Sequence, residues 1–138
     1  TRLAILSRGL GDVYKRQISY LIRHGMIDEL ERHIHPDAVL ADHARLGGGV
    51  GGREDFLFFM RSWQEMWNEG EPDHGGLVAT GGDRLALMEY RFGTEGEWRI
   101  DRLAVVEVDQ QGLLIYLNFY DPEDRDIAVA ELEQRGTG

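Results

Sequence analysis

Histidines and carboxylates that could do chemistry gather in one short stretch of this sequence. His33, His35, Asp37 and His43 lie close together along the chain. Histidines two residues apart do not share a helix face, and a proline follows His35, so we expect no metal site. Asp42 precedes His43 directly. Adjacent side chains of a strand point to opposite faces, which excludes a direct catalytic dyad between them.

His43 is the better candidate of that pair for a pocket residue. Val39, Ala41 and Arg45 would share its face of a strand, and Leu40 would lie opposite. Imidazole changes protonation near neutral pH, which suits a general acid or base. The alternative is a structural hydrogen bond.

Glu107 is the second catalytic candidate. Val105, Val106 and Val108 surround it, and an apolar setting would favour the protonated carboxyl and suit it to proton transfer. The simpler interpretation is an ion pair with an arginine such as Arg91 or Arg102.

A glycine motif in the middle of the chain could suggest a dinucleotide cofactor. Gly47, Gly49 and Gly52 match G-x-G-x-x-G ahead of a predicted helix. However, the preceding strand is polar, and Glu54 and Asp55 would repel a phosphate. We therefore interpret this segment as a loop and expect no cofactor.

The elements that must position these residues follow from hydrophobic periodicity and from turn signals. Phe56, Phe59, Met60 and Trp63 recur at helical spacing. Asp121 and Pro122 match an N-cap and the first position of a last helix. The pattern predicts a helix ending near residue 23, helices over 26–34, 53–68 and from 121 to about 136, and strands over 38–46, 77–80, 84–92, 98–109 and 113–120, with a break at 35–37 and a loop over 47–52.

Composition limits the classes of partner. The 138 residues carry a formal charge of −10, which disfavours nucleic acids and anionic membranes. Cysteine is absent, so disulfides and thiolate chemistry are excluded. This fits a reducing cytoplasm, where we expect the protein.

The first residues differ from the rest. Residues 7–17, SRGLGDVYKRQ, resemble a translated sequencing adapter, and they contain the only lysine of the chain. We therefore expect residues 1–17 to be a non-native tail. The native domain, residues 18–135, would then lack its own N-terminus.

Several segments together resemble the bacterial SnoaL-like branch of the nuclear transport factor 2-like superfamily. They are residues 36–47, 52–56, 106–109 with Gly112, 119–124 and 130–135. The resemblance runs from about residue 25 to residue 135. It implies an α+β domain in which helices wrap a cone-shaped, curved antiparallel sheet.

The same resemblance implies a small-molecule pocket, although fold alone does not settle function. We expect a non-catalytic binding or sensory domain, alone or as a piece of a larger bacterial regulatory protein. The alternative is a small lyase or isomerase of the polyketide-cyclase or dehydratase type. The expected ligand is a small hydrophobic organic molecule, and we expect a homodimer through an uncovered sheet face. The predicted pocket residues are His43, Phe59, Trp63, Tyr90 and Tyr116.

Overall fold

One six-stranded sheet organises the chain in a computed structural model that describes residues 21, 26–43, 49–66, 77–82, 84–94 and 98–137. The strand order is β2-β1-β6-β5-β4-β3. The predicted tail, residues 1–17, lies outside the described residues. The elements are α2 (Ile27–Glu31), β1 (Ile34–Asp42), β2 (Gly49–Gly51), α3 (Arg53–Met66), β3 (Leu77–Thr80), β4 (Leu85–Thr94), β5 (Trp98–Val108), β6 (Leu114–Tyr120), η1 (Pro122–Asp124) and α4 (Arg125–Thr137).

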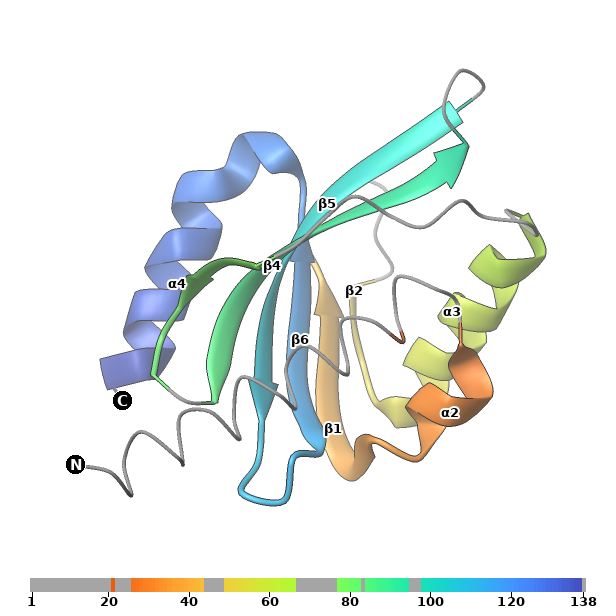
Figure 1. Ribbon diagram of the computed structural model, residues 1–138, viewed down its shortest axis with the longest axis horizontal. Helices are drawn as coiled ribbons and strands as arrows, with labels where there is room; N and C mark the ends of the chain where they lie inside the picture. Colours follow the sequence, from red (N-terminus) through yellow and green to blue (C-terminus); the bar gives the residue numbers. More distant parts are fainter. Residues whose placement is uncertain are drawn as a thin grey trace.

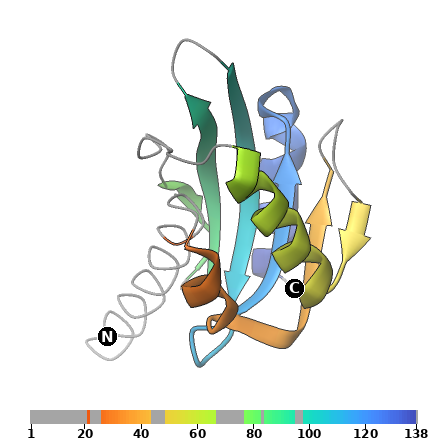
Figure 2. The same cartoon turned by 90° about the vertical axis from the view of Figure 1, so that its right-hand side faces the viewer.

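Helices cover both faces of the sheet, which confirms the predicted α+β class. Helices α2 and α3 lie on one face and α4 on the other (Figures 1 and 2). Contacts of α3 with β1 and β2, and of α4 with β4 and β5, agree with this layering. The sheet face that was expected to be uncovered therefore carries α4 (Figure 1). Because α4 contacts β4 and β5, the second face is not the fully uncovered surface on which the homodimer prediction rested.

Strand β1 departs from its prediction in bounds and in direction. It begins at Ile34 and includes the segment from His35 to Asp37, which was expected to break the chain. Pro36 is accommodated because the register against β6 shifts between Ile34 and Val39. The β1–β6 pairing is parallel, so the sheet is not wholly antiparallel.

Alternation along the strands divides the buried side chains into two cores. One lies under α2 and α3, and we call this side of the sheet the α3 face; the other lies under α4, on the α4 face. In β6, Leu117 and Phe119 belong to the first core and Tyr116 and Tyr120 to the second. A register shift opposite β5 lets Leu114 join the α3 face as well. Each strand in the middle of the sheet therefore contributes to both cores.

The start of α3 depends on a close approach between two segments. Part of the glycine run predicted as a loop forms the edge strand β2 against β1. The backbone oxygen of Gly52 accepts the first helical hydrogen bond, from Phe56 at 3.1 Å. The carboxylate of Asp55 accepts the Gly52 N–H at 3.2 Å, which is one half of a capping box.

We expect Gly51→Ala to destabilise the fold by about 1 kcal/mol, the usual cost of a lost helix cap. A Cβ at position 51 would lie 2.8 Å from the Asp55 Oδ2 and 2.9 Å from its Cβ, so Asp55 must move away. Gly52→Ala is the matched control, because nothing lies within 4 Å of its Cβ position. Urea unfolding of the two variants measures the difference, and equal midpoints would contradict this account.

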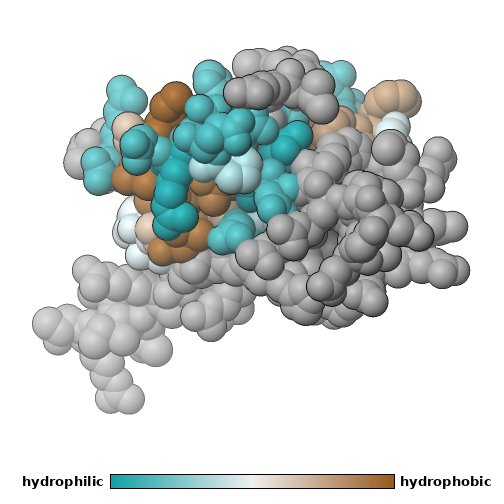
Figure 3. Space-filling view, turned by 90° about the horizontal axis from the view of Figure 1, so that it is seen from above, coloured by the Kyte–Doolittle hydropathy of each residue, from teal (hydrophilic) through white to brown (hydrophobic). Residues whose placement is uncertain are grey.

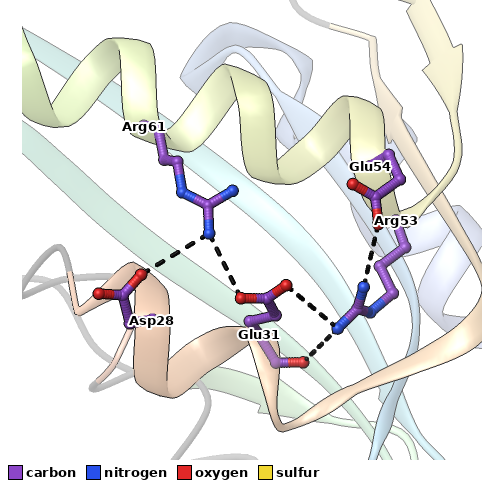
Figure 4. Close-up of polar contacts among 5 residues, drawn as sticks. All are labelled: Asp28, Glu31, Arg53, Glu54 and Arg61. Carbon is purple, nitrogen blue, oxygen red and sulfur yellow. Dashed lines mark hydrogen bonds and ion pairs between the residues drawn. The ribbon is translucent and has the colours of Figure 1, made fainter.

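Two arginines of α3 tie it to α2 (Figure 4). Arg53 donates to the backbone oxygen of Glu31 at 3.0 Å, and Arg61 contacts the Glu31 carboxylate at 3.3 Å and that of Asp28 at 3.6 Å. The network orients α3 over the sheet. No helix in the described part of the chain is long and apolar enough to cross a membrane.

Candidate functional site

A row of three polar side chains crosses the α3 face, and we call it the polar row: Tyr90, Arg102 and Asp121. Tyr90 of β4 is the register partner of Arg102 of β5. Leu103 pairs with Tyr120, so Arg102 lies beside Asp121 at the end of β6. Their neighbours Leu103 and Tyr120 belong to the α4-face core, and alternation therefore places Arg102 and Asp121 on the α3 face.

Two members of the polar row, Arg102 and Asp121, form a mostly buried ion pair. The Arg102 Nη1 lies 3.3 Å from the Asp121 Oδ1, and each side chain is only 11% exposed. The same Nη1 donates to the backbone oxygen of Asp101 at 3.0 Å. Both contacts that Arg102 makes within the described residues thus use one of its three nitrogens, so the guanidinium keeps donors for an oxygen atom.

Asp121 was expected to cap the last helix, and its position at the N-cap of η1 confirms the place of that helix start. Its side chain makes no capping hydrogen bond, however, because the carboxylate turns to Arg102 instead. An ion pair with the neighbouring strand β5 has replaced the local cap. This change brings a charged pair to the α3 face that local patterns did not predict.

Apolar side chains line the α3 face next to the polar row. Met88, Ala104 and Phe119 form the adjacent row of the sheet, and all three are buried. The rings of Tyr90 and Phe119 meet edge to face at 6.1 Å. Phe59 of α3 is partly buried against the same core. A polar end beside an apolar surface is the usual composition of a small-molecule site.

The predicted pocket residues do not come together on one face. Phe59 and Tyr90 lie on the α3 face, and their role in binding stays a prediction. Trp63 belongs to α3, but its side chain lies outside what the structure describes. Tyr116 packs on the α4 face, and His43 is exposed with its ring 5.1 Å from that of Tyr120 on the same face.

The placement of His43 in a pocket under α3 was therefore wrong. The physical reason for the error is which residues of β1 face α3. His43 directly follows β1, and alternation still groups it with Val39 and Ala41. Ala38 and Leu40 are the residues buried in the α3-face core, and Val39 is 45% exposed. Alternation gave the correct grouping, but it could not say which group α3 covers.

Glu107 also lies on the α4 face, and there it forms the predicted kind of ion pair with an unexpected arginine. Its Oε1 accepts from the Nε and Nη2 of Arg135 at 3.1 and 2.9 Å. The expected partners were Arg91 and Arg102. Arg135 comes instead from α4, and its guanidinium carbon also lies 3.6 Å from the centre of the Tyr116 ring.

Beneath α4, hydrogen bonds converge on one carboxylate. Glu131 accepts from the Tyr116 hydroxyl at 2.9 Å and, at 3.4 Å, from the amide nitrogen of Asn118. That amide also donates to the Tyr120 hydroxyl at 3.0 Å. Burial, above all, and the Glu131 carboxylate raise the pKa values of both tyrosines above their usual value. Strand alternation places Tyr116, Asn118 and Tyr120 on one face, whereas Glu131 was not among the predicted site residues.

Alkaline solution should destabilise the protein through these two tyrosines. Their folded pKa values exceed the unfolded value of about 10, so the folded state holds more protons above that pH. The stability that they contribute is fully present below pH 10 and is lost as the pH rises toward the folded pKa values. Urea midpoints measured between pH 8 and pH 11 test this. A Tyr116→Phe, Tyr120→Phe double variant should lose less stability over that interval; an unchanged loss would refute the assignment.

A separate open cleft lies where α2 ends and α3 begins. Its volume is about 720 Å³, and its lining includes Glu31, Arg53, Glu54 and Leu113. Arg53 is already paired with Glu54 at 3.1 Å and contacts Glu31. Among the described residues, no group of three or more histidines and carboxylates is placed to hold a metal ion.

Solved structures of other proteins share this architecture. A steroid delta-isomerase from Pseudomonas aeruginosa aligns with a TM-score of 0.61 and 18% identity, over 91% of this chain and 89% of the other. A polyketide cyclase candidate from Xanthomonas campestris pv. campestris aligns with a TM-score of 0.60 and 16% identity, over 88% and 97%. The chain has a nuclear transport factor 2-like fold. A designed protein with a curved β-sheet aligns with a TM-score of 0.56 and 15% identity, over 87% and 92%.

These likenesses establish the nuclear transport factor 2-like fold and no activity. No protein-family model matches the sequence, and no curated protein matches it either. Because the fold hosts enzymes as well as a designed protein, the site must carry any argument about function.

Proposed function

We propose that this chain is a non-catalytic domain that binds a small, largely apolar organic molecule on the α3 face. The observation that carries the proposal is the ion-paired Arg102 beside the apolar side chains of the α3-face core. Asp121 holds the guanidinium of Arg102 in place. The remaining N–H groups of Arg102 suit a carbonyl or similar oxygen of the ligand. Phe59, Tyr90 and, as a prediction, Trp63 would contact the apolar part.

The binding energy would come mainly from burial. Apolar area removed from water contributes about 25 cal/mol per Å², whereas a hydrogen bond from a charged donor adds about 1.5–3 kcal/mol. The guanidinium would therefore select an oxygen-bearing ligand over a plain hydrocarbon by roughly tenfold or more. Such a domain could act as a sensor, alone or within a larger bacterial regulatory protein.

Two naphthalenes of similar shape test this proposal. The wild-type protein should bind 2-acetylnaphthalene about tenfold more tightly than 2-ethylnaphthalene, which lacks the oxygen. An Arg102→Met, Asp121→Leu double variant removes both charges together and should bind the two probes equally. Fluorescence titration measures both affinities. Equal binding by the wild type, or a preference that survives in the variant, would disprove the role of Arg102.

A second candidate function is a small lyase or isomerase. It is favoured by the carboxylate of Asp121 and the phenol of Tyr90, which flank Arg102 in one row. The neighbours described as an isomerase and as a cyclase candidate lend the same support. His43 and Glu107, the bases expected from sequence, lie on the α4 face and would need a site there.

Exchange with heavy water separates the two functions. A base on the α3 face would speed deuterium exchange at the methyl group of 2-acetylnaphthalene, and Asp121→Asn would abolish the effect. A binding domain leaves the exchange rate at its value in buffer. NMR follows the methyl signal directly.

A further inference from the structure

The carboxylate of Glu131 lies under α4 with neutral hydrogen-bond donors around it. Tyr116 and Asn118 donate to it. Among the described residues, Glu131 has no cationic side chain within 4 Å, because the nearby Arg135 is held by Glu107. Glu107, Glu131 and Arg135 together therefore leave one negative charge without a counterion. A partly buried charge of this kind favours a cation beside it.

A second atom of the same cluster also lacks a partner. Asn118 is 7% exposed, and its side-chain oxygen is buried without a hydrogen bond. Its amide nitrogen is committed to Glu131 and to the Tyr120 hydroxyl. Turning the amide over would not help, since it would set an oxygen against the Glu131 carboxylate. An unmade hydrogen bond of this kind is unfavourable, and a donor entering the cluster would remove the cost.

Two tyrosines lie close to this carboxylate. The Arg135 guanidinium already lies on the Tyr116 ring at 3.6 Å, so that ring accepts a cation on its face. Tyr120 lies next to the exposed His43, with ring centres 5.1 Å apart. Tyr116 and Glu131 are themselves partly exposed, which gives the cluster access to solvent.

We propose that the Glu131 cluster binds a small organic amine in its ammonium form. The ammonium group would donate to the Glu131 carboxylate and to the Asn118 oxygen, and its alkyl part would lie against the tyrosine rings. A primary ammonium has three donors and one positive charge, which match the two oxygens of the Glu131 carboxylate, the Asn118 oxygen and one unbalanced negative charge. This site lies on the face opposite the polar row, and the proposal does not depend on the function of that row.

Titration with n-butylamine hydrochloride at neutral pH tests the proposal. We expect the Asn118 side-chain amide signals in a proton–nitrogen NMR spectrum to shift and saturate. The variant Glu131→Gln keeps the size of the side chain and should raise the apparent Kd roughly tenfold or more. Glu133→Gln is the matched control, because it removes one charge from an exposed position of the same helix and should leave the Kd unchanged.

Two further probes work on the wild-type protein alone. Sodium chloride at equal ionic strength and 1-butanol at equal concentration should both leave the Asn118 signals in place. Equal shifts with sodium chloride would reduce the effect to screening, and equal shifts with 1-butanol would reduce it to apolar contact. Either result, or equal weakening by the Glu131 and Glu133 variants, would overturn the proposal.

Discussion

Replacing Arg102 by leucine is expected to lower the free energy of unfolding by about 3 kcal/mol. The substitution leaves the carboxylate of Asp121 mostly buried, at 11% exposure, without the guanidinium 3.3 Å away. Removing one partner of a buried pair is costly because the remaining charge loses both water and its counterion. Urea unfolding monitored by circular dichroism measures the loss.

The double variant Arg102→Leu, Asp121→Leu provides the control for this prediction. It removes both charges and fills the space with apolar side chains, so its stability should lie closer to the wild type than that of either single variant. A double variant as unstable as the sum of the singles would mean that the pair does not interact. Comparison with Asp121→Leu alone completes the cycle.

Leu57→Ala should destabilise the protein by about 3 kcal/mol, as is usual for a buried leucine whose loss leaves a cavity. Leu57 of α3 is fully buried in the α3-face core, with 0% of its surface exposed. Its neighbour Phe58 is 75% exposed and provides a matched truncation on the same helix. Phe58→Ala should change stability by no more than about 0.5 kcal/mol. Similar losses in the two variants would contradict the orientation of α3.

Periodicity predicted most elements, because their spacing depends on burial alone. Phe56 and Met60 were expected on the inner stripe of α3, and both are buried there. The β3–β6 bounds agree with the predicted strands to within about two residues. The helix after Asp121 also begins where it was expected. These features depend on local hydrophobic patterns and turns.

The site was harder to predict because it depends on contacts between distant segments. The Arg102–Asp121 pair joins β5 to the residue that follows β6, and nothing in the residues beside Asp121 distinguishes it from an ordinary helix cap. His43 was grouped correctly with Val39, but the face that α3 covers is a tertiary choice. Glu131 was not predicted as a site residue, because a glutamate on a polar helix is typical of a solvated surface.

Hydrophilic residues form most of the surface around α4, which is why Glu131 looked like an ordinary surface residue. Seen from the end where β4 and β5 project, the described surface is mainly hydrophilic. On the α4 side, hydrophobic residues lie among the hydrophilic ones (Figure 3). Ile127 of α4 is 49% exposed, whereas Ala128 and Leu132 are buried against the sheet. Helix α4 therefore buries a narrow apolar stripe, and polar contacts through Glu131 and Arg135 add to its attachment.

Asp121 connects the two faces of the sheet, because it pairs with Arg102 on the α3 face and precedes the helix that covers the α4 face. This residue directly follows the strand that carries Tyr120, and it is the N-cap of the helical segment that leads to Glu131. A molecule that draws Arg102 away from Asp121 would weaken the attachment of the segment at the start of α4. The distance between Glu131 and the tyrosines would then change. Thermodynamic linkage makes such an effect mutual. An occupant under α4 would change the affinity of the opposite face by the same factor, so the sheet could relay binding from one side of the molecule to the other.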